Sequence, residues 1–195
     1  MTINLIIVAA ASFLLGSIPF GYIVAKIKGV DIRKHGSGNI GATNVYRTIG
    51  KKEGVLTLLL DLMKGLICVL AAKLVFSNPI YWYVASIFSV LGHDFSVFLK
   101  FKGGKGVATT YGAVLGLVPY AALIGMFIWI SILLKTKYSS LAALLSFFIS
   151  TTTSVVFFKN GYVEYIFVFL FILMIAKHKE NIKRIINREE KSINL

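Results

Sequence analysis

Apolar runs of membrane-spanning length dominate this sequence. A bilayer core about 30 Å thick needs about 20 apolar residues in a helix, and the 195-residue chain, 57% hydrophobic, offers several such runs. Its mean hydropathy of +0.80 lies far above that of soluble domains. The sequence therefore predicts an all-α integral membrane protein with no separate soluble domain.

The first apolar run, residues 3–25, is followed by Lys26 and Lys28 and preceded by no basic residue. This order is the reverse of a cleaved signal peptide, so we expect a retained span with the N-terminus outside. The remaining long runs predict further spans at 54–76, 80–99, 139–158 and 161–176.

The 28 residues at 107–134 allow two interpretations, one tilted helix or two short crossings divided at Pro119. Two crossings, roughly 107–118 and 119–134, place 18 of the 21 basic residues inside, as the positive-inside rule requires. We therefore predict seven spans, one of them short, with the C-terminus cytoplasmic and short amphipathic segments at the inner face. The domain assignment is one polytopic domain, 1–195, whose cytoplasmic motif segments are 26–53, 100–106 and 177–195.

Membrane topology also explains the formal charge of +13, because the basic residues sit in short loops between apolar runs. We therefore expect no nucleic-acid partner. The single Cys68 lies inside an apolar run, so it provides neither a disulfide nor a cysteine-based metal site. We expect no metal and no cofactor.

A glycine-rich basic turn at residues 102–110 reads Lys-Gly-Gly-Lys-Gly-Val-Ala-Thr-Thr. Its glycines let backbone amides approach a ligand, and the run that follows reads as the first turns of a helix. Amides, a helix N-terminus and Lys105 together favour an anion, and phosphate is the anion we expect. The alternative is a basic loop that only obeys the topology rule.

A second polar stretch covers residues 36–47, Gly-Ser-Gly-Asn-Ile-Gly-Ala-Thr-Asn-Val-Tyr-Arg. Its first six residues formally match the dinucleotide fingerprint Gly-x-Gly-x-x-Gly. That fingerprint needs a preceding strand and a βαβ unit, and nothing in the chain alternates strand with helix, so we reject the match.

On a short helix over 41–49, three polar residues of this stretch would share one face: Thr43, Asn44 and Arg47. Arginine suits a bidentate grip on phosphate. The alternatives are a positive-inside anchor for the arginine, and turn-making and capping for Ser37 and Asn39.

Charged residues also occur inside the apolar runs. Asp61 and Lys64 are three apart, and because buried charges in lipid are costly, we expect them to pair within the bundle. His93 and Asp94 are adjacent and point apart on a helix, so they form no ready-made acid–base pair. We interpret His93 as a histidine whose polar atoms are satisfied inside the bundle.

The third polar cluster is the tail, where His178 and Asn181 share a helix face and three isoleucines form an apolar stripe: Ile182, Ile185 and Ile186. A basic amphipathic helix on the inner membrane surface accounts for most of these residues. It does not account for a histidine and an asparagine at the membrane boundary.

Together the three clusters resemble the bacterial acyl-phosphate-dependent glycerol-3-phosphate acyltransferases, the PlsY family. The likeness is carried by GSGNIGATN at 36–44 with Arg47, by GGKGVAT at 103–109 after Gly92-His93, and by His178-x-x-Asn181. It extends over nearly the whole chain. The resemblance implies a seven-span, multi-pass fold in the inner membrane with cytoplasmic motifs, which agrees with the charge-based count.

The resemblance implies transfer of a fatty acyl group from acyl phosphate to the 1-hydroxyl of glycerol 3-phosphate. The products would be lysophosphatidic acid and phosphate, in the first acylation step of bacterial phospholipid synthesis. The implied partners are glycerol 3-phosphate, acyl phosphate and membrane lipid, with functional coupling to the enzyme that makes acyl phosphate. In agreement, the His-x-x-x-x-Asp motif of many other acyltransferases is absent, because Ile40, Phe98 and Lys183 stand five positions after the three histidines.

Carried over residue by residue, the resemblance implies catalytic roles for Ser37, Arg47, Lys105, His178 and Asn181. It implies phosphate contacts for a further set: Gly36, Gly38, Asn39, Thr43, Asn44, Gly103, Gly104, Gly106 and Thr109. A cationic site suits two anionic substrates, which otherwise repel each other, and stabilises the charge that grows during transfer. The general base stays open between His178 and an oxygen of the acyl phosphate.

Two other classes of function compete with this interpretation. A transporter for phosphate or a phosphorylated metabolite would also use broken spans and a basic cavity, but most polar residues cluster at the inner face and not at the midplane. A membrane scaffold that gathers anionic lipid would leave the glycine loop unexplained.

Overall fold

The structure, a computed structural model, describes residues 1–157 and 161–193, and every regular element in these two ranges is a helix. The all-α prediction is therefore confirmed. Two parts of the sequence-based assignment, the last residue of the 139–158 span and the loop residue Lys159, lie outside the described residues. The chain divides into two compact units, Met1–Leu117 and Val118–Leu195.

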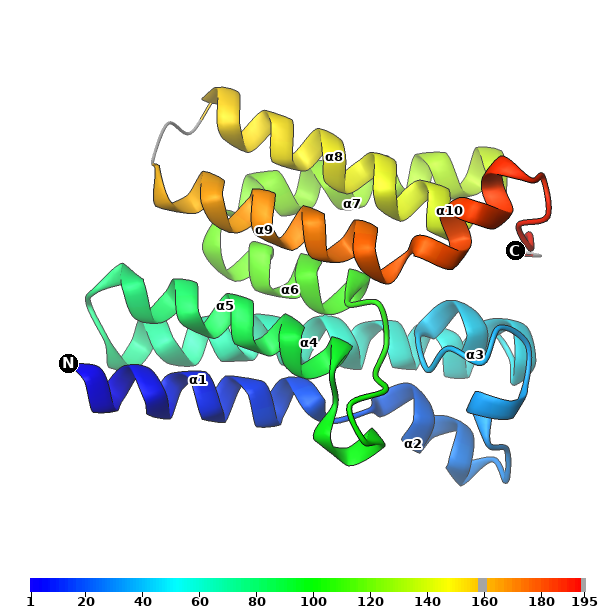
Figure 1. Ribbon diagram of the computed structural model, residues 1–195, viewed down its shortest axis with the longest axis horizontal. Helices are drawn as coiled ribbons and strands as arrows, with labels where there is room; N and C mark the ends of the chain where they lie inside the picture. The colour runs from blue at the N-terminus through cyan, green and yellow to red at the C-terminus, as the bar shows by residue number, and fades with distance from the viewer. Residues whose placement is uncertain (158–160, 194–195) are drawn as a thin grey trace. The chain divides into compact units, whose positions relative to one another are not determined.

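The first unit is built on four helices that pack against one another: α1 (Thr2–Ser17), α4 (Lys51–Val75), α5 (Pro79–Asp94) and α6 (Val107–Leu117). Four shorter helices connect them: α2 (Phe20–Ile27), η1 (Ile32–Lys34), α3 (Ala42–Thr48) and η2 (Val97–Leu99). The connections from α2 to α4 and from α5 to α6 both lie away from the N-terminus of this unit (Figure 1). The polar stretches 36–47 and 102–110 therefore emerge toward the same end.

The first apolar run is present as a span, but it is interrupted. α1 ends at Ser17 and α2 begins at Phe20, because Pro19 has no backbone N–H and the residue before a proline is driven out of helical backbone. Ile18 accordingly has φ −58° and ψ 116°. The interruption leaves the carbonyl of Ile18 available to a donor from another helix.

Five helical segments of the described chain are long and apolar enough to cross a membrane: Thr2–Ile27, Lys51–Val75, Pro79–Leu99, Pro119–Thr136 and Ser139–Val156. The protein is therefore a multi-pass membrane protein. The predicted division at Pro119 is confirmed, because α6 ends at Leu117 and α7 begins at Pro119. A count of seven also needs the 11-residue α6 and the 16-residue α9, and it stays a prediction, as does the orientation.

The second unit contains α7 (Pro119–Thr136), α8 (Ser139–Phe157), α9 (Tyr162–Lys177) and α10 (Lys179–Ile186). α7 packs on α8 and α8 on α9, and the buried rings of Phe147 and Phe167 stack with centroids 5.9 Å apart. The tail after α10 returns to the turn between α7 and α8, where the Ile193 N–H donates to the Lys137 carbonyl at 2.9 Å.

Candidate active site

An apolar core supports both polar stretches of the first unit. Its buried side chains come from α2, η1, the loop before α3, α3 itself and η2: Val24, Ala25, Ile32, Ile40, Val45 and Leu99. Full burial of an aliphatic side chain of this size contributes about 1.5–3 kcal/mol. Because Leu99 lies just before the glycine turn, the same hydrophobic core supports both that turn and the loop before α3.

The side chain of Asn44 organises the loop before α3. Its Oδ1 accepts the backbone N–H of Ser37 at 2.9 Å, and its Nδ2 donates to three carbonyls, those of Ile32, His35 and Asn39, at 3.3, 3.0 and 2.8 Å. The side chain is 1% exposed. Its amide is thus committed to the loop backbone, and a direct contact of Asn44 with phosphate stays a prediction.

Ser37 lies in an exposed part of this loop, between two glycines in the left-handed region. Gly36 has φ 62° and Gly38 has φ 71°, values that residues with a β-carbon rarely adopt. A β-carbon on Gly36 would also overlap Asn44 Oδ1. Glycine at position 36 is therefore required both by the backbone and by the position of the Asn44 side chain.

The short helix predicted over 41–49 is α3, Ala42–Thr48. Thr43 and Arg47 are one turn apart on it and half-buried, whereas Asn44 is buried against the loop. The three polar residues of this face therefore have different environments. Asn44 shapes the loop, and Thr43 and Arg47 retain partial access to solvent.

The glycine turn runs from Gly103 to Gly106 in irregular backbone, and α6 begins at Val107. The prediction of a glycine loop at a helix N-terminus is confirmed. The N–H of Gly104 donates to the carbonyl of His93 at 3.0 Å, and a β-carbon on Gly104 would overlap His93 Nε2. Lys105 is half-buried, while Thr109 is fully buried in the first turns of α6.

Three buried polar residues form a cluster in this unit. Lys64 Nζ lies 2.8 Å from Asp61 Oδ1, which confirms the predicted pairing, and His93 Nδ1 lies 3.5 Å from the same oxygen. Their exposures are 2%, 2% and 4%. The sequence predicted the pair but treated His93 separately.

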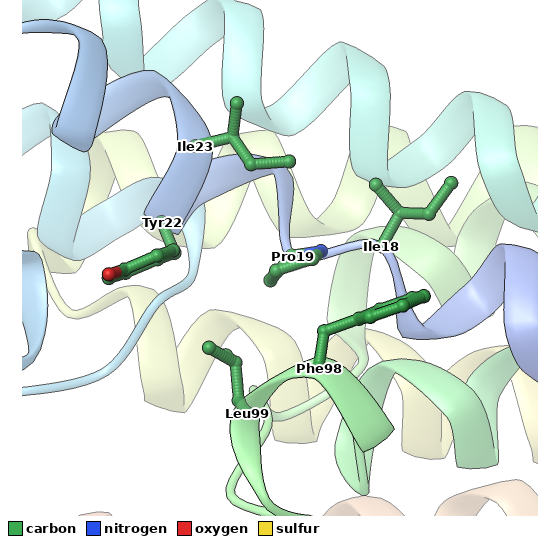
Figure 2. Close-up of a pocket in the computed structure, with 6 residues that line it drawn as sticks. All are labelled: Ile18, Pro19, Tyr22, Ile23, Phe98 and Leu99. Carbon is green, nitrogen blue, oxygen red and sulfur yellow. The ribbon is translucent and has the colours of Figure 1, made fainter.

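A cavity of about 310 Å³ opens between the α1–α2 interruption and η2 (Figure 2). Its lining is almost entirely apolar: Ile18, Pro19, Tyr22, Ile23, Phe98 and Leu99. Two cationic side chains lie near the Tyr22 ring: Arg33 Cζ is 4.6 Å and Lys26 Nζ is 5.8 Å from the ring centroid. An apolar cavity beside cations suits an amphiphile with an anionic head group.

The arginine beside this cavity is itself held in place. Asp31 accepts from Arg33 Nε and Nη2, each at 2.8 Å. The Arg33 guanidinium lowers the pKa of the Asp31 carboxyl to about 2. Asp31 therefore remains ionised at any physiological pH and keeps Arg33 oriented.

In the second unit, His178 lies at the junction of α9 and α10 and is buried. Its Nδ1 is 2.8 Å from the carbonyl of Met174. A carbonyl only accepts, so this bond places the proton on Nδ1, and in the neutral ring Nε2 is the acceptor nitrogen. That tautomer is compatible both with orienting a substrate hydroxyl and with accepting its proton.

Asn181 is held by a carboxylate that sequence reasoning missed. Glu190 Oε1 accepts from Asn181 Nδ2 and Ser140 Oγ, each at 2.6 Å, and Oε2 accepts from Arg184 Nε at 2.8 Å. Burial raises the pKa of Glu190, but the hydrogen bonds from Ser140, Asn181 and Arg184 outweigh burial and leave the pKa below its usual value. Glu190 thus joins α8, α10 and the tail.

The loop before α3, α3 itself and the glycine turn, which carry Ser37, Arg47 and Lys105, therefore lie toward one end of the first unit (Figure 1). His178 and Asn181 belong to the second unit, at the start of α10. No group of three or more metal-ligating side chains occurs among the residues described. The first unit offers cations, exposed loop backbone and a helix N-terminus, which is the chemistry of an anion site.

Comparison with known proteins gives a consistent result. The family model described as glycerol-3-phosphate acyltransferase matches residues 6–188. The glycerol-3-phosphate acyltransferase of Pseudothermotoga lettingae is 42% identical over 98% of this chain and 96% of its own length. That of Pelagibacter ubique is 45% identical, over 95% of each chain.

Crystal structures of PlsY, an integral membrane glycerol 3-phosphate acyltransferase, are also similar. The glycerol 3-phosphate form has a TM-score of 0.92 and the lysophosphatidic acid form one of 0.90. Both are 39% identical to this chain and cover 98% of it, with 96% of each PlsY chain matched. On this evidence the chain belongs to the glycerol-3-phosphate acyltransferase family.

Proposed function

We propose that this protein transfers a fatty acyl group from acyl phosphate to the 1-hydroxyl of glycerol 3-phosphate, releasing lysophosphatidic acid and phosphate. The observation that carries the proposal is the similarity, over 98% of the chain, to PlsY crystallised in glycerol 3-phosphate and lysophosphatidic acid forms. The glycine loop with Lys105 at the start of α6 supports it, because it supplies the donors that a phosphate needs.

In this account the phosphate groups are held by Ser37, Arg47 and Lys105. Backbone atoms of the two glycine-containing loops and the hydroxyl of Thr43 provide further contacts to these phosphate groups. The guanidinium of the half-buried Arg47 offers a bidentate contact, and Lys105 offers a compact charge beside the helix N-terminus. Asn44 holds the Ser37 loop, and Thr109 is buried in the first turns of α6.

The chemical step is attack of the 1-hydroxyl oxygen on the acyl carbonyl carbon. The new ester C–O bond forms, and the bond between the acyl carbon and the phosphate oxygen breaks, with its electron pair leaving on phosphate. The hydroxyl proton passes to a phosphate oxygen of the donor. The alternative proton acceptor is Nε2 of His178. Cations at the site lower the repulsion between the two substrates and stabilise the departing phosphate.

The alkyl chain of the donor needs an apolar surface beside these cations. The cavity lined by Ile18, Tyr22 and Phe98 offers one in the first unit (Figure 2). At about 310 Å³ it lies at the small end of ligand sites, about 300–1,000 Å³, so it would hold part of a fatty chain and leave the rest in lipid.

The cellular setting follows from the same proposal. We place the protein in the inner membrane as one polytopic domain with seven spans, the N-terminus outside and the three motif segments cytoplasmic. Substrate would come from an acyl-phosphate-producing enzyme, to which this protein would be functionally coupled. The reaction would be the first acylation in bacterial phospholipid synthesis.

The test is an assay of the purified protein with glycerol 3-phosphate and one of three donors: palmitoyl phosphate, palmitoyl-CoA or palmitoyl-acyl carrier protein. We expect lysophosphatidic acid and phosphate in equal amounts from palmitoyl phosphate alone. A preparation that is folded and makes product only from palmitoyl-CoA would refute the donor assignment. A folded preparation inactive with all three would refute the function.

A further inference from the structure

The buried cluster of Asp61, Lys64 and His93 contacts the glycine turn through His93. A charge buried in a membrane protein is costly unless it is paired and usually serves the function. Here the Asp61–Lys64 pair accounts for its own charges, at 2.8 Å. His93 adds a third buried polar group 3.5 Å from the carboxylate, which a pair that only stabilised the helix bundle would not need.

His93 contacts the glycine turn in two ways. Its backbone carbonyl accepts the N–H of Gly104 at 3.0 Å. Its ring edge, at Nε2, occupies the space that a β-carbon on Gly104 would fill. The imidazole ring therefore packs directly against Gly104, the residue before Lys105.

Asp61 determines which edge of the ring faces the turn. The carboxylate attracts the Nδ1 side, at 3.5 Å, so the Nε2 side faces Gly104. Lys64 in turn fixes the carboxylate, since its Nζ also donates to the Ile18 carbonyl at 2.8 Å. That carbonyl is exposed to a side-chain donor only because the first span is interrupted at Pro19.

The same stretch of α4 also contacts α6, which follows the glycine turn. A β-carbon on Gly65 would overlap the Thr109 carbonyl in the first turns of α6, so the helices are in close backbone contact there. α4 therefore contacts the glycine turn indirectly at two places. Asp61 of α4 contacts His93, which packs against Gly104, and Gly65 of α4 packs against the start of α6, which follows the turn.

We propose that Asp61 and His93 are positioning residues for the phosphate of glycerol 3-phosphate, acting through the backbone of Gly104 and Lys105. This inference rests on the proposed function, because it assigns glycerol 3-phosphate to the glycine turn. Neither residue contacts substrate. Their effect is to keep the turn in the conformation that receives the phosphate, so their loss weakens ground-state binding of one substrate.

The experiment measures kcat and both KM values for His93→Gln, which leaves the ion pair intact. It also uses the double variant Asp61→Asn/Lys64→Met, because Asp61→Asn alone would leave a buried lysine without its carboxylate. The matched control is Ser86→Ala. Ser86 is a buried residue of α5, the helix that carries His93, and its Oγ donates to the carbonyl of Tyr83 in the same helix.

We expect both variants to raise the KM for glycerol 3-phosphate by about tenfold or more, with kcat and the KM for palmitoyl phosphate changed less than about threefold. Ser86→Ala should leave all three parameters unchanged. A merely structural role would lower the active fraction, and hence kcat, without moving this KM. An unchanged KM for glycerol 3-phosphate in either folded variant would overturn the inference.

A double-mutant cycle gives a second readout that does not depend on the ion pair. Gly104→Ala should raise the KM for glycerol 3-phosphate because its methyl group meets His93 Nε2, and in a His93→Ala background the same methyl group should cost much less. Additive effects would contradict the contact. Wild-type protein without turnover would refute the proposed function, whereas active wild type with additive variants would refute this inference alone.

Discussion

Asn44 Oδ1 accepts the backbone N–H of Ser37 at 2.9 Å, so a buried side chain on α3 fixes the position of an exposed serine seven residues earlier. The same side chain reaches three carbonyls of that loop. The loop before α3 is therefore held from within, by one amide, and not by its own turn residues alone.

Asn44→Ala removes all four of these hydrogen bonds. At about 0.5–1.5 kcal/mol each, we expect a loss of about 2–6 kcal/mol in stability. We also expect a loss of about 10²-fold in turnover, because Ser37 and Arg47 are displaced. Thermal unfolding in detergent and product assays measure the two effects. The control is Asn187→Ala, an exposed asparagine in the tail. An Asn44→Ala protein with wild-type turnover would show that the loop conformation is unimportant.

Arg47→Ala and Lys105→Ala should each abolish measurable turnover while leaving the fold intact. Charge-assisted contacts to phosphate contribute about 1.5–3 kcal/mol each before any effect on the transition state. Arg47→Lys should remain impaired, since the bidentate fork is lost. Lys100→Ala serves as the control, because Lys100 is exposed before the glycine turn. Near-normal turnover in either alanine variant would remove that residue from the site.

Two variants of His178 separate orientation from base catalysis. Gln places its amide near Nε2, so if His178 only orients the substrate, His178→Gln should retain part of the activity, and the rate should not titrate near the imidazole value of about 6.5. Asn preserves a donor near Nδ1 for Met174 but removes Nε2, so His178→Asn should be the less active variant. If His178 is the base, His178→Gln should lose roughly 10²–10⁴-fold in kcat together with the acid limb of the pH profile.

Glu190→Gln should destabilise the second unit in a pH-dependent way. The pKa of Glu190 lies below its usual value in the folded protein, so the stabilising contribution is present above the unfolded pKa of about 4.3 and is lost as pH falls through the folded pKa. The difference in Tm between wild type and variant should therefore be largest near neutral pH and shrink below about pH 4. The control is Glu189→Gln, at the neighbouring exposed residue. A Tm difference between wild type and Glu190→Gln that grew as the pH fell would contradict this prediction.

Much of the fold was predictable because each signal is local. The break at Pro119 and the start of α6 after the glycine turn follow from proline and glycine chemistry, and the Asp61–Lys64 pair follows from the i, i+3 spacing of two charges in an apolar run. The interruption at Pro19 carried the same proline signal, but the surrounding run read as one long apolar segment.

What sequence reasoning missed depends on contacts between distant segments. Glu190 meets Ser140, fifty residues earlier, and no spacing rule connects them. The Asn44 partners are backbone atoms, which have no sequence signature. His93 was interpreted as a satisfied core histidine, and its place under Gly104 became visible only when α5 and the glycine turn were placed together.

In the proposed reaction, the 1-hydroxyl of glycerol 3-phosphate attacks the acyl carbon of acyl phosphate. The most direct measurement uses glycerol 3-phosphate labelled with ¹⁸O at the 1-hydroxyl, palmitoyl phosphate as donor, and mass spectrometry of both products. We expect the label to be retained in the ester of lysophosphatidic acid and to be absent from the released phosphate. Label in the released phosphate, or phosphate release without labelled lysophosphatidic acid, would contradict it.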